Sequence, residues 1–131
     1  GTENVSVCWD DFTVAPKNWD LGTVAAGGTA ADNGLVARNN GNVREKFTVS
    51  CSASSSPSGW VLATAAGADQ FEMQVNNGSG WLNLKAPQDI VGQLYSGRNK
   101  TFDLQISLPT SVSAGGGVEQ TITVTITATK D

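Results

Sequence analysis

The sequence contains no histidine in 131 residues. Histidine is the only side chain whose ordinary pKa lies between about pH 5 and 8, and it is also the commonest metal ligand. Because its absence removes the usual general base, we expect no enzymatic activity, no metal and no cofactor. The remaining candidates are carboxylates, and none of them lies in a calcium-loop spacing: Asp10, Asp11, Asp20 and Asp32. Asp10 and Asp11 are adjacent in sequence and are better explained as a solvated turn than as a catalytic pair.

Charged residues are also scarce, at 15% of the chain, and eight basic against twelve acidic residues give a net charge of −4. The sequence shows no run of Lys and Arg that could neutralise a phosphate backbone, so we expect no nucleic-acid partner. Apolar runs of about 18 residues are absent as well, so we expect no membrane span. A composition low in charge and rich in hydroxyl groups is typical of secreted β proteins.

Cysteine is limited to Cys8 and Cys51. Two cysteines without metal-binding spacing predict one disulfide bond in an oxidising compartment, and two buried free thiols are the alternative. The chain begins at Gly1 without an initiator methionine, as expected after removal of a signal peptide, so we predict an extracellular or cell-surface location. Three N-x-S/T motifs are glycosylation candidates if the source organism glycosylates exported proteins: Asn4, Asn77 and Asn99.

Alternation of apolar and polar residues is the strongest positive signal. Between Val118 and Ala128 the residues Ile122, Val124 and Ile126 share one face, while every odd position from 121 to 129 is threonine. Side chains alternate across a β-strand, so one face of this segment must be buried. A second strand alternates in the same way, with Phe102, Leu104, Ile106 and Leu108 on one face. We expect these two strands to belong to two sheets that share one core.

The rest of the chain predicts about eight to ten short strands separated by turns, without a convincing amphipathic helix. The Asn40–Gly41 step predicts a hairpin across residues 35–51, and a second hairpin is predicted across residues 71–84. Residues 88–94 allow one helical turn but are too few to decide. The pattern predicts an all-β fold, an antiparallel two-sheet sandwich of the immunoglobulin-like class, with a jelly roll as the alternative. We expect residues 1–131 to form a single domain.

Three stretches carry a resemblance to known proteins. Leu21-Gly22-Thr23-Val24, a glycine turn at Gly27-Gly28, and residues 35–43 resemble the opening strands of immunoglobulin-like surface modules. That resemblance implies a fold and an extracellular address, but no activity. The size, the processed start, the N-x-S/T motifs and the terminal strand are also similar to secreted fibre and pilus subunits, such as the TasA and camelysin group and archaeal bundling pili. In those proteins a terminal strand completes the sheet of a neighbour.

Tryptophan is the remaining clue to function. Trp60 is predicted to fill the core, and an exposed Trp81 could stack on a sugar ring or contact another subunit. The candidates for subunit contacts are Val5, Val7, Trp9, Trp19 and Trp81.

Together these observations favour a structural subunit of an extracellular filament or pilus, whose partner is itself and which assembles by β-strand complementation. Residues 1–9 are the possible donor strand, and a Cys8–Cys51 bond would then join neighbouring subunits. The alternatives are a carbohydrate-binding or adhesion module, with glycans as partners, and an accessory domain of a larger surface or viral assembly.

Overall fold

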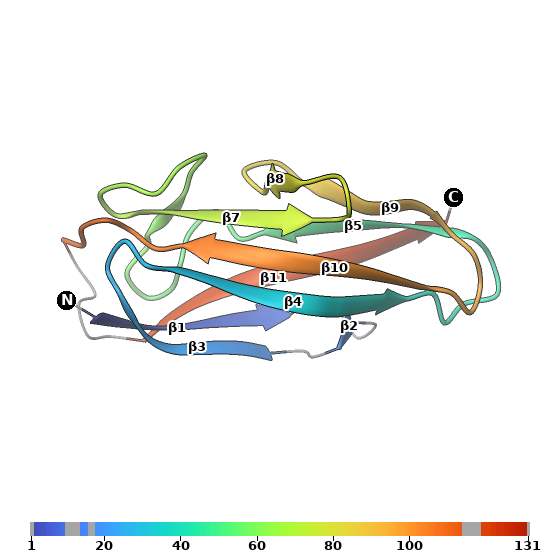
Figure 1. Ribbon diagram of the computed structural model, residues 1–131, viewed down its shortest axis with the longest axis horizontal. Coiled ribbons are helices and arrows are strands. Elements are labelled where there is room, and N and C mark those ends of the chain that lie inside the picture. The colour runs from blue at the N-terminus through green and yellow to red at the C-terminus, as the bar shows by residue number, and fades with distance from the viewer. Residues whose placement is uncertain (1, 10–13, 16–17, 114–118, 131) are drawn as a thin grey trace.

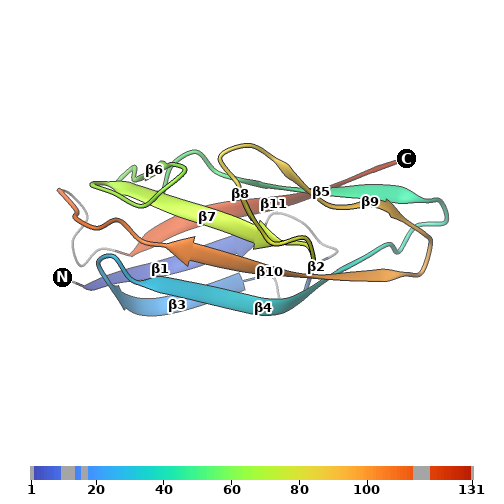
Figure 2. The same cartoon turned by 45° about the horizontal axis from the view of Figure 1, so that its top comes forward.

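The computed structural model describes residues 2–9, 14–15, 18–113 and 119–130, and it describes the side chains of residues 25–113 and 119–129. These residues form eleven strands and no helix. The strands run along the long axis of the molecule in two layers (Figure 1; Figure 2). The all-β sandwich expected from the sequence is confirmed.

The first sheet has five strands and contains both the first and the last strand of the chain. Its order is β3-β1-β11-β5-β9. The bounds are β3 Asn18–Ala25, β1 Thr2–Trp9, β11 Gln120–Lys130, β5 Glu45–Cys51 and β9 Gln88–Leu94. All pairs in this sheet are antiparallel except β1 with β11, which run parallel.

The second sheet has six strands, and β10 lies near its middle. Its order is β2-β4-β10-β7-β6, and β8 pairs with β7 off this path. The bounds are β2 Val14–Ala15, β4 Thr29–Arg38, β10 Asn99–Ser107, β7 Gln70–Asn76, β6 Val61–Leu62 and β8 Trp81–Asn83.

One apolar core fills the space between the sheets. From the first sheet, Ile122, Val124 and Ile126 are buried, and from the second sheet Phe102 and its alternate neighbours on β10 are buried. The prediction that these two strands share a core is therefore confirmed. Trp60 also lies in this core, at 1% exposure, as the sequence predicted. Burying so many large apolar side chains is the dominant stabilising contribution to such a fold.

The expected hairpin across residues 35–51 is wrong. β4 pairs with β10 and β2, whereas β5 pairs with β11 and β9, so the two strands lie in different sheets. The turn at Asn39–Gly41 reverses the chain as its composition indicates, but it carries the chain from one sheet to the other. We call this connection, residues 39–44, the first arch.

The second hairpin, across residues 71–84, is confirmed by the antiparallel pairing of β7 with β8. Residues 88–94 form a strand and no helical turn, since β9 pairs with β5 and buries Ile90 and Leu94. Residues 95–98 then carry the chain from β9 in the first sheet to β10 in the second, and we call them the second arch. Within the described part of the chain, no helix is long and apolar enough to cross a bilayer.

Candidate functional site

The N-terminal strand β1 occupies an interior position in the first sheet. Residues Val5 to Trp9 pair with Gln120 to Val124 of β11, and on the other side residues 2–8 pair with β3. The register sets Val5, Val7 and Trp9 opposite Gln120, Ile122 and Val124, each of which has 0% exposure. A strand from the very start of the chain thus has backbone partners on both sides.

Of the proposed subunit-contact residues, four lie in this region. Val7 is directly opposite Trp19 of β3, so the structure brings these two positions together. The side chains of Val5, Val7, Trp9 and Trp19 lie outside the described residues, as does that of the glycosylation candidate Asn4.

The two cysteines flank β11. Cys8 is opposite Thr123 on one side, and Cys51 is opposite Val124 on the other. Neighbouring strands lie about 4.8 Å apart, so two positions separated by one strand have Cα atoms about 10 Å apart. A disulfide needs a Cα separation below about 7 Å. Cys51 is a free thiol in the structure, and the expected Cys8–Cys51 bond is not formed.

Cys51 is largely withdrawn from water and packs against the core. Burial raises the pKa of its thiol to about 12, and a hydrogen bond with Ser52 offsets only part of that shift. The thiol is therefore kept in its protonated, unreactive form at neutral pH.

The glycosylation candidate Asn77 lies in the turn between β7 and β8, where its side chain has structural partners. Its Nδ2 donates to the carbonyl oxygen of Asp89 at 2.8 Å, and its Oδ1 accepts from the backbone N–H of Ser79. Asn99 begins β10 and is exposed, and its Oδ1 accepts from Nη1 of Arg38 at 3.2 Å.

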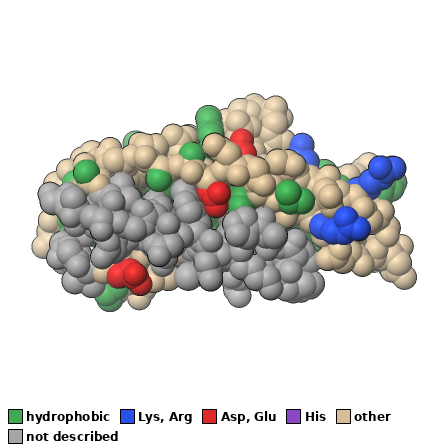
Figure 3. All heavy atoms as spheres, turned by 60° about the horizontal axis from the view of Figure 1, so that its bottom comes forward, with side chains coloured by type: hydrophobic (Ala, Val, Ile, Leu, Met, Phe, Trp, Pro, Cys, Tyr) green, Lys and Arg blue, Asp and Glu red, His purple; other side chains and the backbone are tan. Residues whose placement is uncertain are grey.

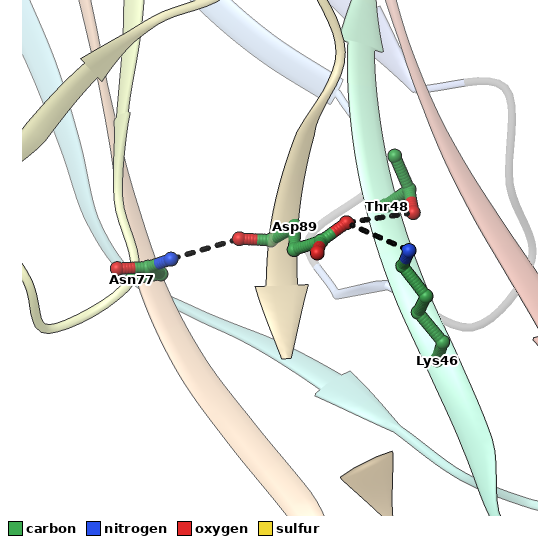
Figure 4. Close-up of polar contacts among 4 residues, drawn as sticks. All are labelled: Lys46, Thr48, Asn77 and Asp89. Atoms are coloured by element: carbon green, nitrogen blue, oxygen red, sulfur yellow. Dashed lines mark hydrogen bonds and ion pairs between the residues drawn. The ribbon is translucent and has the colours of Figure 1, made fainter. Parts of the chain in front are cut away.

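Asp89 connects three elements at the edge of the first sheet (Figure 4). Its carboxylate accepts from Oγ1 of Thr48 at 3.4 Å and lies 3.5 Å from Nζ of Lys46, both on β5. Its backbone carbonyl accepts from Asn77 in the turn between β7 and β8. One carbonyl on the outer edge of β9 is thereby occupied, which protects that edge from pairing with another strand.

The edge of the second sheet carries a bulge. Residues Leu35 and Asp32 of β4 face Phe102 and Leu104 of β10, so the bulge falls at Asn33–Gly34. Gly34 has φ 75°, a conformation that favours glycine, and its N–H donates to Oδ1 of Asp103 at 2.8 Å. Bulges twist an edge away from potential partners.

Two carboxylates come together at this bulge. Partial burial, and secondarily the charge of Asp103, raise the pKa of Asp32 above its ordinary value. Among the described residues no group of three or more His, Cys, Asp or Glu side chains is placed to hold a metal ion.

The two arches lie side by side at the right-hand end of Figure 1, and Asn39 holds them together. Asn39 has 0% exposure. Its Nδ2 donates at 2.7 Å to both the Val43 and the Leu94 carbonyl, and its Oδ1 accepts from the N–H of Gly41. Its backbone N–H and carbonyl bond to Arg98 and Gly97 of the second arch. All polar groups of this buried residue are thus satisfied.

The arches also bring together all three arginines of the chain, a cluster not expected from the sequence. Arg38 ends β4, Arg44 lies in the first arch and Arg98 in the second, and all three are exposed. Arg44 lies over the ring of Tyr95, with its guanidinium carbon 5.8 Å from the ring centroid. We call the surface formed by Arg38, Arg44 and Arg98 the arginine end. The positions of the three arginines along the chain do not predict this cluster, because it forms only where two connections distant in sequence lie side by side.

At the opposite end of the sandwich, Asp69 joins two loops. Ser113 donates to its carboxylate through both the hydroxyl and the backbone N–H, and these hydrogen bonds lower the pKa of Asp69.

Trp81 lies apart from both ends, at the start of β8, and is 40% exposed as predicted.

Comparison of the sequence with models of known protein families and with curated proteins gives no match.

Proposed function

We propose that the protein is a structural subunit of an extracellular filament or pilus, and that neighbouring subunits exchange β1. The observation that supports this proposal is the interior position of a terminal strand. β1 contributes backbone hydrogen bonds to β11 on one side and to β3 on the other. The same strand from another subunit makes the same bonds, so exchange of an identical element has a small free-energy cost.

The position of β1 must be filled by some strand. Without it, β11 loses its pairing along residues 120–124, and β3 loses its pairing along residues 18–25. Unpaired edges of this kind are sites of association between chains. A subunit that has given away its own β1 therefore has a strong preference for the β1 of another copy.

Two other edges of the sandwich, those of β9 and β4, are less suited to assembly. The Asn77 side chain occupies a carbonyl of β9, and the bulge at Asn33–Gly34 interrupts the edge of β4. These features favour strand insertion beside β11 over simple addition at those two edges. The low charge content and the resemblance to secreted fibre subunits support an extracellular location.

Deleting residues 1–9 tests the proposal. We expect the full chain to form filaments visible by negative-stain electron microscopy and the truncated chain to form none. A synthetic peptide of residues 1–9, added under reducing conditions, should bind the truncated chain and shorten filaments of the full chain. The matched control is the same peptide with Val7→Pro, because proline lacks the N–H and disrupts an interior strand. Filaments formed equally well by the truncated chain would contradict strand exchange.

A second candidate function rests on Trp81. An indole that is 40% exposed can stack on a sugar ring, as in a carbohydrate-binding or adhesion module. For that function Trp81→Ala should abolish binding to a glycan array. Val61→Ala is the control, since Val61 is an apolar residue of similar exposure, at 46%.

A further inference from the structure

We propose that the arginine end binds an acidic polysaccharide, with Arg38 and Arg98 holding its carboxylate or sulfate groups. The site is distinct from β1 and from Trp81, so it does not depend on strand exchange.

The first reason is the distribution of charge. The protein has a net charge of −4, yet its three arginines all lie at one end. On the face shown in Figure 3, Lys and Arg side chains gather toward the right-hand end, while Asp and Glu side chains lie toward the middle and left. Among the described residues, Glu45 is an acidic residue next to the arches, and its carboxylate lies beside Gly41. In the described part of the chain, this end therefore carries a concentration of positive side chains on an acidic molecule, which attracts anions.

The second reason is that Arg38 is oriented. Its Nε donates to Oδ1 of Asn40 at 2.9 Å and its Nη1 to Oδ1 of Asn99 at 3.2 Å. Neither amide neutralises its charge, and three of its five N–H groups are not used in these two bonds. Among the described residues, neither Arg38 nor Arg98 has a carboxylate within ion-pair distance. A guanidinium held in this way is ready to form paired hydrogen bonds with a planar or tetrahedral anion.

The third reason is the rigidity of the two arches. Asn39 connects them through its side chain and backbone, and Oγ of Ser96 adds a bond to the Gly41 carbonyl at 2.6 Å. Loops that are fixed before binding lose little entropy when a ligand arrives. These bonds fix the backbone that carries the arginines.

The chemistry around the arginines suits a sugar polymer. Tyr95 is 59% exposed, and Asn40 and Asn99 are exposed amides that can bond hydroxyl groups. Since the three arginines lie together at one end, this surface is suited to a short stretch of polymer and not to wrapping a long polyanion. These features favour an acidic polysaccharide over nucleic acid.

The test is binding of the full chain to heparin, which carries sulfate groups, and to polygalacturonate, which carries carboxylates, with dextran as the neutral polymer. We expect binding to at least one acidic polymer and none to dextran. Raising the salt from about 0.05 M to about 0.3 M should weaken binding strongly, because exposed charges are screened. The polymer that binds identifies the anionic group.

Arg38→Gln and Arg98→Gln should each weaken binding roughly tenfold, since each removes a charge-assisted bond. Lys85→Gln, which removes the same charge from the β8–β9 connection, should change binding less than about twofold. Thermal unfolding of each variant checks that the fold is retained. Absence of binding to both acidic polymers would overturn the proposal, as would equal losses for all three variants. The proposal would also fail if the arginine variants changed filament length but left polymer binding unchanged. The arginine end would then contact a second copy of this chain and not a polysaccharide.

Discussion

At the scale of single residues, Asn39 shows the clearest difference between the environment expected from the sequence and the environment found in the structure. Its neighbours Asn40 and Gly41 predict a surface turn, but Asn39 itself is fully buried and bonds to both arches. A buried amide is stabilising only while its partners are present, because a buried polar group without a partner retains its desolvation cost.

We expect Asn39→Ala to destabilise the protein by about 2–4 kcal/mol, since it leaves two carbonyls and one N–H without their partner. Urea unfolding followed by tryptophan fluorescence measures the change in the free energy of unfolding. Asn40→Ala is the control, because Asn40 is exposed and its loss should cost less than about 0.5 kcal/mol. Equal effects of the two substitutions would contradict the role assigned to Asn39.

The ionisation of Asp32 should make the stability of the protein depend on pH. Its pKa is raised in the folded state by partial burial and by Asp103, so the folded state binds its proton more tightly than the unfolded state does. Stability therefore falls as the pH rises through the ordinary pKa of a carboxyl and on through the raised one, and the full penalty applies at neutral pH. We expect Asp32→Asn to stabilise the protein at pH 7. The gain should disappear below about pH 3, where both forms are neutral. Urea unfolding at the two pH values tests this, and a variant less stable than the parent at pH 7 would contradict it.

At the scale of elements, alternation predicted the faces of the long strands correctly. On β10 and β11, one row of side chains is buried as the pattern required. The pairing of strands was harder to predict, because a turn sequence such as Asn39–Gly41 fixes only a local reversal of the chain. Whether β4 pairs with β5 or with β10 depends on distant segments that compete for the same edge. The arginine end escaped prediction for the same reason.

Val124 tests the central strand of the first sheet. It has 0% exposure and lies between Trp9 of β1 and Cys51 of β5 in the register. We expect Val124→Asp to prevent folding or to cost at least about 3–5 kcal/mol, because the buried charge has no partner.

The control for Val124→Asp is Thr129→Asp on the same strand, where the residue is exposed and opposite Lys46. Circular dichroism during urea unfolding should show a near-normal transition for this control. A normal transition for Val124→Asp as well would show that the face is not buried.

At the scale of the whole molecule, the register determines what kind of polymer exchange of β1 can produce. Cys8 and Cys51 remain on opposite sides of β11 whether β1 comes from the same chain or from a neighbour in the same register. Their separation of about 10 Å is too large for a disulfide. The covalent ladder expected from the sequence is therefore not expected from the fold.

We predict that filaments dissociate into single chains on a denaturing gel run without reductant. The alkylating reagent is present throughout denaturation, so that each thiol is blocked as it becomes exposed and no bond forms during the experiment. Mass measurement of the band should show two modifiable thiols per chain after unfolding. A ladder of covalent multimers would contradict the register between β1 and β11.

The pairing of the first strand with the last also sets the order of events as the chain is made. β1 is synthesised well before its partner β11, which spans residues 120–130. Until then β1 has no parallel partner in its own chain, and closing such a long loop is slow compared with local folding. In the strand exchange proposed above, a β11 from a completed neighbour would compete for the waiting strand during that interval. The local concentration of subunits, and not only the stability of the fold, would then decide between a closed monomer and a growing fibre.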